Sequence, residues 1–334
     1  MSNLESKSGS SQKNTTIDTL RTALGSETVP LASRFRALFS LKHLAAQGDD
    51  EQAQAAIEAI AAAFTTPSAL LKHELSYCLG QTRSMKAVPF LRDRLDDKKE
   101  DPMVRHESAE ALAAIGDAGS LDTMKKMRDD PHEPDVVRET CDIAVDRITW
   151  QLSEAGKKEV LKQSDFASID PAPPMETTET QPNIQSLQRT LLDTSLPLFK
   201  RYRAMFALRD LASPPDAPTA KPAVEALATG FSDKSALFRH EIAFVFGQLS
   251  HPASIPSLHQ VLSNQNEESM VRHEAAEALG SLGEEPGVEN MLKQFLNDAE
   301  QVVRDSVVVA LDMAEYERTG QMEYATIPEV TASA

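Results

Sequence analysis

One motif is written four times in this chain, and the repetition constrains the fold more than any other feature. The stretch Met103–Gly116 (MVRHESAEALAAIG) is nearly copied in Met270–Gly283 (MVRHEAAEALGSLG). Each has a relative 33 residues upstream, Leu71–Gly80 (LKHELSYCLG) and Phe238–Gly247 (FRHEIAFVFG), so the dipeptide His-Glu occurs four times. Self-similarity at a fixed short period predicts a stack of similar units rather than a single globular core.

The repetition has two levels. A shift of 167 residues superimposes one half of the chain on the other, so that Arg34–Leu41 falls on Arg201–Leu208 and all four His-Glu dyads coincide. Within each half, a period of about 33 residues is marked by a hydrophobic residue followed by a basic one. These pairs are Phe35-Arg36, Leu71-Lys72, Val104-Arg105, Val137-Arg138, Tyr202-Arg203, Phe238-Arg239, Val271-Arg272 and Val303-Arg304. Because no strand-like alternation accompanies the period, we predict an all-α fold, an α-solenoid of eight helical hairpins in two pseudo-symmetric halves.

Residues of the capping type indicate where the helices begin. Asp101 before Pro102 is typical of an N-cap, and Ser68 and Ser235 are candidates in neighbouring units. In the fourth dyad unit the candidates are Glu268 and Ser269. In the third unit one face of the helix is predicted to be buried, and the helix is expected to end at Gly116. The residues of this buried face are Val104, Ser108, Leu112 and Ile115. With these caps, all four histidines lie about five residues into their helices.

Composition shifts predict the domain organisation. Residues 1–16 are polar and Ser-rich and are predicted to form a disordered tail, followed by a four-repeat half over 17–152. Residues 153–185 carry four prolines among Ser, Thr and Glu and are predicted to form a flexible tether. A second four-repeat half is expected over 186–316 and a loose tail over 317–334.

Charge and cysteine content limit the partners and the compartment. The net charge of −17 argues against a nucleic acid or an anionic membrane and favours a basic partner. No apolar run approaches the length of a membrane span. Two cysteines, Cys78 and Cys141, are too few for a disulfide framework, so a reducing cytoplasm is the expected location.

The matched depth of the dyads predicts a metal site. Inner helices of a solenoid lie about 10 Å apart, so residues at equal depth on adjacent helices become neighbours. Each half then offers two imidazoles and one carboxylate, the ligand set that holds non-haem Fe(II) with open coordination positions. The two predicted sets are His73, His106 and Glu107, and His240, His273 and Glu274. Halves that face each other would hold two metals at the pseudo-twofold axis.

The other acids near the dyads have different expected roles. Glu74 and Glu241 are the acids left over from the first and third dyads, and they suit an ammonium-bearing substrate beside the metals. Glu110 and Glu277 lie four residues beyond a histidine, on the same helix face. They either orient the imidazoles or form surface salt bridges with the recurrent arginines. Aromatic residues one turn beyond a histidine are predicted to be packing groups; these are Tyr77 and Phe244.

The unit from Asp101 to Gly116 resembles the short HEAT-like repeats that also occur in phycobilin lyases, and the four dyads in two halves resemble the deoxyhypusine hydroxylase family. The resemblance implies a di-iron monooxygenase that uses two Fe(II) ions per chain, O2 as co-substrate and an external electron donor of unknown identity. Such an enzyme hydroxylates the aminobutyl arm of deoxyhypusine on translation initiation factor 5A, which forms hypusine. By this resemblance the two predicted sets each ligate one iron, and Glu74 and Glu241 hold the amines of the arm.

Three alternatives remain open from the residues alone. A non-catalytic acidic HEAT-repeat scaffold could bind a basic protein partner along its concave side. A bilin lyase would give no reason for the duplicated ligand sets. A two-metal hydrolase would use its metals to activate water.

Overall fold

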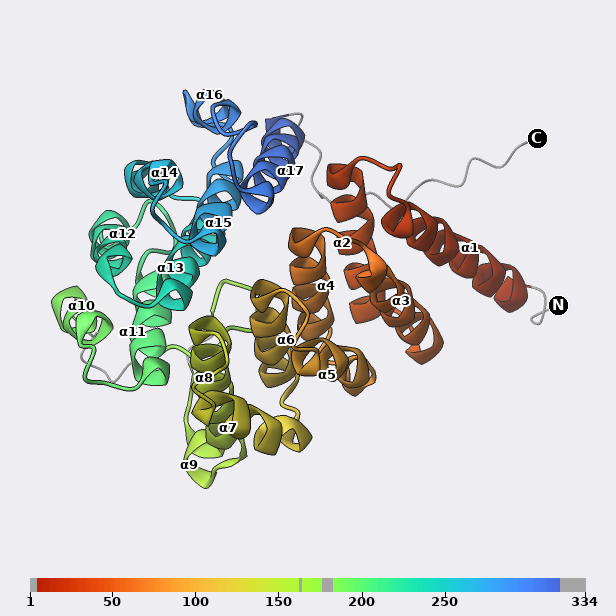
Figure 1. Ribbon diagram of the computed structural model, residues 1–334, viewed down its shortest axis with the longest axis horizontal. Helices are drawn as coiled ribbons and strands as arrows, with labels where there is room; N and C mark the ends of the chain where they lie inside the picture. The colour runs from red at the N-terminus through yellow and green to blue at the C-terminus, as the bar shows by residue number, and fades with distance from the viewer. Residues whose placement is uncertain (1–4, 162–163, 176–182, 319–334) are drawn as a thin grey trace.

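The computed structural model describes residues 5–161, 164–175 and 183–318, and all regular structure in these residues is helical. Eight helices line the inside of a ring (Figure 1). They are α2 (Leu31–Gln47), α4 (Ala69–Gln81), α6 (Pro102–Ile115), α8 (Asp135–Leu152), α11 (Leu198–Leu211), α13 (Ala236–Leu249), α15 (Ser269–Gly280) and α17 (Gln301–Arg318). The prediction of an all-helical solenoid is confirmed.

A second set of helices lies outside the ring and packs against the first. The outer helices are α1 (Glu5–Gly25), α3 (Asp50–Ala62), α5 (Val88–Asp96), α7 (Leu121–Asp129), α10 (Ile184–Leu192), α12 (Ala220–Ala228), α14 (Ile255–Ser263) and α16 (Val288–Lys293). The short helix α9 (Glu154–Lys158) follows α8, and five 3-10 turns are η1 (Ala63–Thr65), η2 (Met85–Ala87), η3 (Ala118–Ser120), η4 (Thr229–Ser232) and η5 (Pro252–Ser254). Among the described helices, none combines the length and apolar character that a membrane span requires.

The predicted caps fix the depth of the histidines. Ser68 Oγ accepts a hydrogen bond from the Leu71 backbone N–H at 3.2 Å, and Ser235 and Asp101 cap α13 and α6 in the same way. The N-cap of α15 is Glu268, which resolves the choice between two candidates. Each dyad histidine therefore lies five residues beyond its cap, and the predicted equal depth is confirmed.

In four of the inner helices, α2, α6, α11 and α15, a buried arginine ties the helix to the outer helix before it. Arg105 Nε donates to the Leu95 carbonyl oxygen at 3.0 Å. The same bond, to the carbonyl ten residues earlier, is made by Arg34, Arg201 and Arg272. In two repeats the equivalent arginines are therefore Arg34 and Arg201, and the predicted marker pairs Phe35-Arg36 and Tyr202-Arg203 lie two residues after the correct position. The pattern failed there because Ser33 and Lys200 occupy the position that is hydrophobic in the other repeats.

The solenoid closes on itself. Helix α17 packs against α2 and α4, and α8 packs against α11 and α13, so the two halves meet at two seams. At the first seam Arg36 Nη2 lies 3.0 Å from Asp312 Oδ1. At the second, Ser235 Oγ donates to Glu139 Oε2 at 2.6 Å. The inner helices of both halves consequently surround one common centre.

The segment over residues 164–175, called the strap below, corrects the prediction of a flexible tether over 153–185. Its Ile169 N–H donates to Gln81 Oε1 of the first half at 2.9 Å. Its Ser168 Oγ accepts from Gln248 Nε2 of the second half at 2.7 Å. Four apolar residues of the strap are buried: Ile169, Pro171, Ala172 and Pro173. Composition did not reveal this because Ile169 and Ser168 find these partners 88 and 80 residues away in the sequence.

The predicted outer boundaries also differ from the structure. Residues 5–16, expected as part of a disordered tail, continue helix α1, whose later turns bury Ile17, Leu20 and Leu24. Once the packed turns have formed, each residue added to the helix gains one backbone hydrogen bond, so a polar segment can be helical beside them. The second half begins at Ile184 rather than at residue 186, and α17 extends to Arg318. Residues 319–334 of the expected C-terminal tail lie outside the described residues.

A close helix contact sets the spacing at the centre. A Cβ atom added to Gly80 of α4 would lie 2.7 Å from both the Cα and the Cβ of Ala111 in α6. Only glycine permits this approach. The pseudo-equivalent Gly247 of α13 is less crowded, since its Cβ would lie 3.4 Å from the Ala278 Cα.

Candidate metal centre

The six predicted ligands come together at the centre of the ring from four helices. They are His73 on α4, His106 and Glu107 on α6, His240 on α13, and His273 and Glu274 on α15. The ring centroids of His73 and His106 lie 5.4 Å apart, and His240 and His273 show the same separation. Across the halves, His73 lies 5.4 Å from His273, and His106 lies 5.5 Å from His240. The structure thus places all four imidazoles in one cluster.

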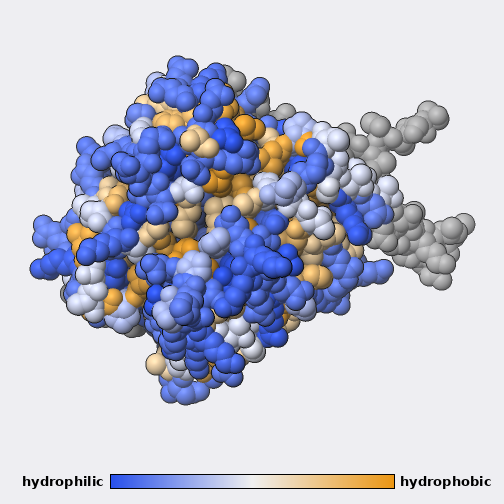
Figure 2. All heavy atoms as spheres, in the orientation of Figure 1, coloured by the Kyte–Doolittle hydropathy of each residue, from blue (hydrophilic) through white to orange (hydrophobic). Residues whose placement is uncertain are grey.

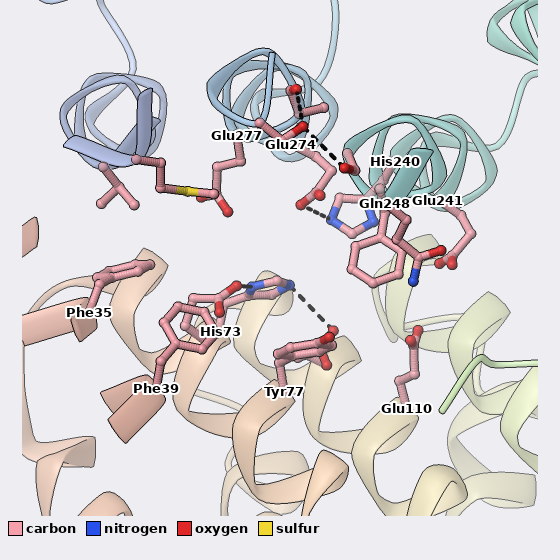
Figure 3. Close-up of a pocket in the computed structure, with 18 residues that line it drawn as sticks. Phe35, Phe39, His73, Tyr77, Glu110, His240, Glu241, Gln248, Glu274 and Glu277 are labelled. Atoms are coloured by element: carbon pink, nitrogen blue, oxygen red, sulfur yellow. Dashed lines mark hydrogen bonds and ion pairs between the residues drawn. The ribbon is translucent and has the colours of Figure 1, made fainter. Parts of the chain in front are cut away.

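Each half brings one carboxylate to this cluster. Glu107 Oε2 lies 3.4 Å from His73 Nε2, and Glu274 Oε2 lies 3.4 Å from His240 Nε2. Figure 3 draws the contact between His240 and Glu274 as a dashed line. The duplication seen in the sequence therefore reappears as a pseudo-twofold arrangement of side chains.

The imidazole nitrogens suit a metal because they are buried and lack hydrogen-bond partners. Both ring nitrogens of His73, His106 and His240, and Nε2 of His273, are inaccessible and make no hydrogen bond among the described residues. Leaving a buried polar atom unpaired costs about 1–3 kcal/mol. Four of these atoms, both nitrogens of His106, Nδ1 of His240 and Nε2 of His273, also have no carboxylate at ion-pair distance among the described residues. Such a cluster is more easily explained as ligands for metal ions than as packing.

The two predicted ligand sets are not assembled equally. His240, His273 and Glu274 form one compact group, with ligand atoms within 4.8 Å of one another. In the first half, His106 belongs both to a group with His73 and His240 and to a group with Glu107 and Glu110. The set His73, His106 and Glu107 needs side-chain adjustment to bind one ion. The role of all six residues as ligands stays a prediction.

Burial and neighbouring charges perturb the histidines in opposite directions. Burial lowers the pKa of His106 and of His273 well below the ordinary value, and the nearby His73 ring lowers both further. Burial also opposes protonation of His73, but the carboxylates of Glu107 and Glu74 outweigh it and leave its pKa well above the ordinary value. Neutral imidazoles and carboxylates are the forms that bind metals.

The surrounding carboxylates repel one another, and a cation bound among them would offset this repulsion. Burial raises the pKa values of Glu110, Glu241 and Glu277 well above the ordinary range, and neighbouring carboxylates raise them further. A like charge nearby disfavours ionisation, whereas a divalent cation inverts that balance. The electrostatics of the centre therefore fit a cationic occupant.

The described residues do not show the surface salt bridges that were one of the two roles left open for Glu110 and Glu277. No ion pair found in the described residues joins either acid to an arginine. Instead, Ser306 Oγ donates to Glu277 Oε1 at 2.9 Å and lies 3.4 Å from His273 Nδ1. Glu277 therefore lies where it can help orient His273. Both acids also line the central cavity.

A cavity of about 260 Å³ opens beside the histidines, between the two halves. Tyr77 and Phe244 lie over the cluster with ring centroids 6.0 Å apart, so these predicted packing groups also form a wall of the cavity. Sequence analysis missed several further lining residues, among them Phe35 and Phe39 of α2 and Met313 of α17. Their contribution depends on ring closure, which no local pattern in the sequence signals.

Comparison with known proteins gives concordant results. The model of the family described as HEAT repeats matches residues 57–144 and 223–312. A deoxyhypusine hydroxylase of Phaeosphaeria nodorum is 67% identical over 324 residues, covering 97% of this chain and 98% of its own. The chain belongs to the deoxyhypusine hydroxylase family. The family member from Aspergillus fumigatus is 67% identical over 320 residues and covers 96% of both chains.

A solved structure of the family supports the fold. The structure of human deoxyhypusine hydroxylase in complex with glycerol matches with a TM-score of 0.81 and 44% sequence identity. The match covers 92% of this chain and 99% of the human chain. The resemblance inferred from the four dyads is thereby confirmed at the level of family and fold, and an enzyme that hydroxylates deoxyhypusine is favoured over the scaffold and the lyase.

Proposed function

We propose that this protein is a di-iron, O2-dependent monooxygenase that hydroxylates the deoxyhypusine side chain of translation initiation factor 5A to form hypusine. His73, His106 and Glu107 would hold one Fe(II), and His240, His273 and Glu274 would hold the other. The observation that carries the proposal is the cluster of buried imidazole nitrogens without partners, duplicated about a pseudo-twofold axis. When bound, the two irons would supply the activation of O2 and the oxidation of a C–H bond.

The protein would contribute binding and orientation. Glu74 and Glu241 lie beside the histidines in the cavity wall and would hold the ammonium groups of the substrate arm by charge-assisted hydrogen bonds. Glu241 Oε1 is buried and makes no hydrogen bond among the described residues, as expected of an atom that awaits a donor. A carbon of the arm between these anchors would then be fixed beside the metal centre.

Apolar side chains would protect the reaction from water. Tyr77, Phe244 and Phe39 line the cavity beside the histidines. Excluding water strengthens the carboxylate grip and limits side reactions of the activated oxygen. The methylene groups of the arm would lie against these rings, while its charged ends would contact the glutamates.

The partner and the compartment follow from charge and thiol chemistry. A net charge of −17 would steer a lysine-bearing, basic loop of factor 5A toward the centre by long-range attraction. Neither nucleic acid nor an anionic membrane would be attracted by this charge. Both cysteines are free and buried, and we place the protein in the reducing cytoplasm.

The first test is the metal content of purified protein with its visible spectrum, before and after reduction and readmission of air. We expect about two irons per chain and an absorption band that depends on oxygen. The product, hypusine on factor 5A, would be measured by mass spectrometry. Protein that takes up no Fe(II) anaerobically would refute the proposal. Iron binding with no oxygen-dependent spectral change would favour a two-metal hydrolase instead.

A second test separates the ligands from the substrate anchors. Replacing Glu74 by alanine should abolish measurable binding of deoxyhypusine-bearing factor 5A while the iron content stays near two per chain. His73→Ala is the control, because losing a ligand should remove iron as well as activity. Glu74→Ala protein that emerged without iron would show that the assigned roles are wrong.

A further inference from the structure

Helices α4 and α13 face each other across the cavity and carry equivalent residues at three levels, each one helical turn apart. Residues four apart in sequence lie on the same face of a helix, and the 167-residue shift maps one series onto the other. The two series are His73, Tyr77 and Gln81 in α4 and His240, Phe244 and Gln248 in α13. Each level thus pairs one residue from each half of the chain.

Direct ring contacts form the first two levels. The ring centroids of His73 and His240 lie 5.9 Å apart, and those of Tyr77 and Phe244 lie 6.0 Å apart. All four rings line the cavity, and Figure 3 shows His73 and Tyr77 on one side with His240 on the other. A change in the separation of α4 and α13 would therefore change the distance between the two proposed ligand sets.

At the third level the strap lies between the two glutamines and binds both. Gln81 Oε1 accepts a hydrogen bond from the Ile169 N–H at 2.9 Å, and Gln81 Nε2 donates to the Ile169 carbonyl oxygen at 3.4 Å. The preceding strap residue, Ser168, accepts from Gln248 Nε2 at 2.7 Å. Two consecutive strap residues consequently join the C-terminal end of α4 to that of α13.

A buried arginine of α11 anchors the strap to the second half. Arg209 is fully buried, and its Nη1 lies 2.9 Å from Asp170 Oδ2. Its Nη2 donates to Ser164 Oγ at 3.0 Å, and the Phe166 ring centroid lies 4.4 Å from its guanidinium carbon. Arg209 Nη1 also donates to Gln248 Oε1 at 2.9 Å. Both polar atoms of the Gln248 amide therefore have partners, which fixes its orientation.

The strap also contacts the first half, where Pro171 lines a small cavity together with Ala113 of α6 and Ile143 of α8. In Figure 2, hydrophobic residues gather near the middle of the face, between the two halves, and hydrophilic residues cover most of the rim. Apolar contact is non-directional, whereas a hydrogen bond requires a defined distance and angle. The hydrogen bonds of the strap are thus suited to fix the geometry between the halves.

We propose that Gln81, Gln248, Ser168 and Ile169 form a clasp that sets the separation of α4 and α13 and thereby positions the two proposed iron sites relative to each other. The consequence at the irons rests on the proposed function. Each proposed ligand set lies within one half of the chain, so opening the clasp leaves each site its own ligands and changes the distance between the sites. The four residues are positioning residues, because none of them belongs to a ligand set.

The first test measures the distance between the halves in metal-free protein. Because both native cysteines are buried, spin labels can be attached selectively to Met85→Cys, after α4, and Gln260→Cys in α14, two exposed positions. Gln81→Met combined with Ser168→Ala removes the three hydrogen bonds of the clasp. At about 2- to 10-fold each, their loss should shift the equilibrium toward separated halves by about 10-fold or more. Pulsed EPR should then show a broader and longer distance distribution, and an unchanged distribution would refute the clasp.

Asp165→Ala is the matched control. Asp165 is an exposed strap residue that accepts a hydrogen bond from Ser213 Oγ at 3.0 Å, a contact with the second half alone. Its replacement should leave the distance distribution unchanged, and equal broadening in this control would refute the assignment to the clasp. Gln81→Met alone removes two of the three bonds and should broaden the distribution less. This single variant keeps the test decisive if the double variant fails to fold.

A second test measures the separation at the metals. The protein is loaded with Mn(II), whose EPR spectrum distinguishes a spin-coupled pair from isolated ions. With the clasp intact we expect the broad spectrum of a pair, and in the double variant the sharp spectrum of isolated ions at the same Mn(II) content. A coupled pair in both proteins would refute the positioning role. If the unmodified protein bound no Mn(II), the proposed two-metal function would fail, whereas the metal-free distances would still decide whether the clasp exists.

Discussion

The contact between Gly80 and Ala111 predicts that one methyl group can disturb the proposed first iron site and spare the proposed second one. In Gly80→Ala the new Cβ would lie 2.7 Å from backbone and side-chain atoms of Ala111, which no rotamer change can relieve. Separation of α4 from α6 by about 0.7 Å is needed to reach the 3.4 Å at which ordinary contact begins. His73 and His106 lie on these two helices, so their separation changes with it.

The magnitude follows from opposing effects. Overpacking of this kind costs about 1–3 kcal/mol, and replacing a helical glycine by alanine returns about 1 kcal/mol. We expect a net loss of up to about 2 kcal/mol, which corresponds to a fall in melting temperature of up to about 4 °C. Metal–ligand distances tolerate only about 0.2 Å. The displacement should therefore lower the iron content toward one per chain.

Gly247→Ala is the matched control, because its Cβ would lie 3.4 Å from the Ala278 Cα and 3.6 Å from its Cβ. This variant should keep two irons and melt at the same temperature as the unmodified protein or slightly higher. The assay is iron per chain by elemental analysis, together with thermal unfolding followed by circular dichroism. Equal iron loss in both variants, or full iron content in Gly80→Ala, would refute the link between helix spacing and the first site.

Three further predictions concern the second site, the repeat contacts and the metal. Ser306→Ala should weaken Fe(II) binding at the proposed second site by about 10- to 100-fold, because the Ser306 hydroxyl contacts both His273 and Glu277. A calorimetric titration with iron measures this affinity, and an unchanged affinity would contradict the prediction. The Arg272 guanidinium lowers the pKa of Asp298 to about 2, so this pair stabilises the fold by roughly 2 kcal/mol above pH 4 and loses the contribution as the pH falls toward 2. The stability difference between the protein and Asp298→Asn should shrink over that range in denaturant titrations; a constant difference would exclude the ion pair as its source. Removing iron with a chelator should lower the melting temperature reversibly, and a melting temperature unaffected by chelation would show that the cluster is stable without metal.

The sequence predicted the positions of the four histidines better than the walls of the cavity around them. The depth of each histidine depends on a local cap such as Ser68 or Ser235, and caps act within one helical turn. Once four dyads share one depth, stacking of the inner helices brings them together. The predicted ligand sets needed no knowledge of distant contacts.

The walls of the cavity depend on contacts between distant segments. Phe39 and Met313 line the same cavity only because the last inner helix returns to the first, and the motif carries no signal of this closure. The strap was likewise predicted as flexible because its composition is poor in large apolar residues. Its order depends on Gln81 and Gln248, two residues whose partners are invisible to any local analysis.

Closure of the ring changes how the chain is expected to unfold. An open array of repeats loses its terminal units first, because each unit touches only its neighbours. Here the terminal helix α17 is covered by α2 and α4, so neither end is free to fray by itself. Fraying at the α2–α17 seam would separate the two proposed sets of iron ligands, so bound iron would oppose it. We therefore expect a single cooperative transition with iron and stepwise loss of the halves without it.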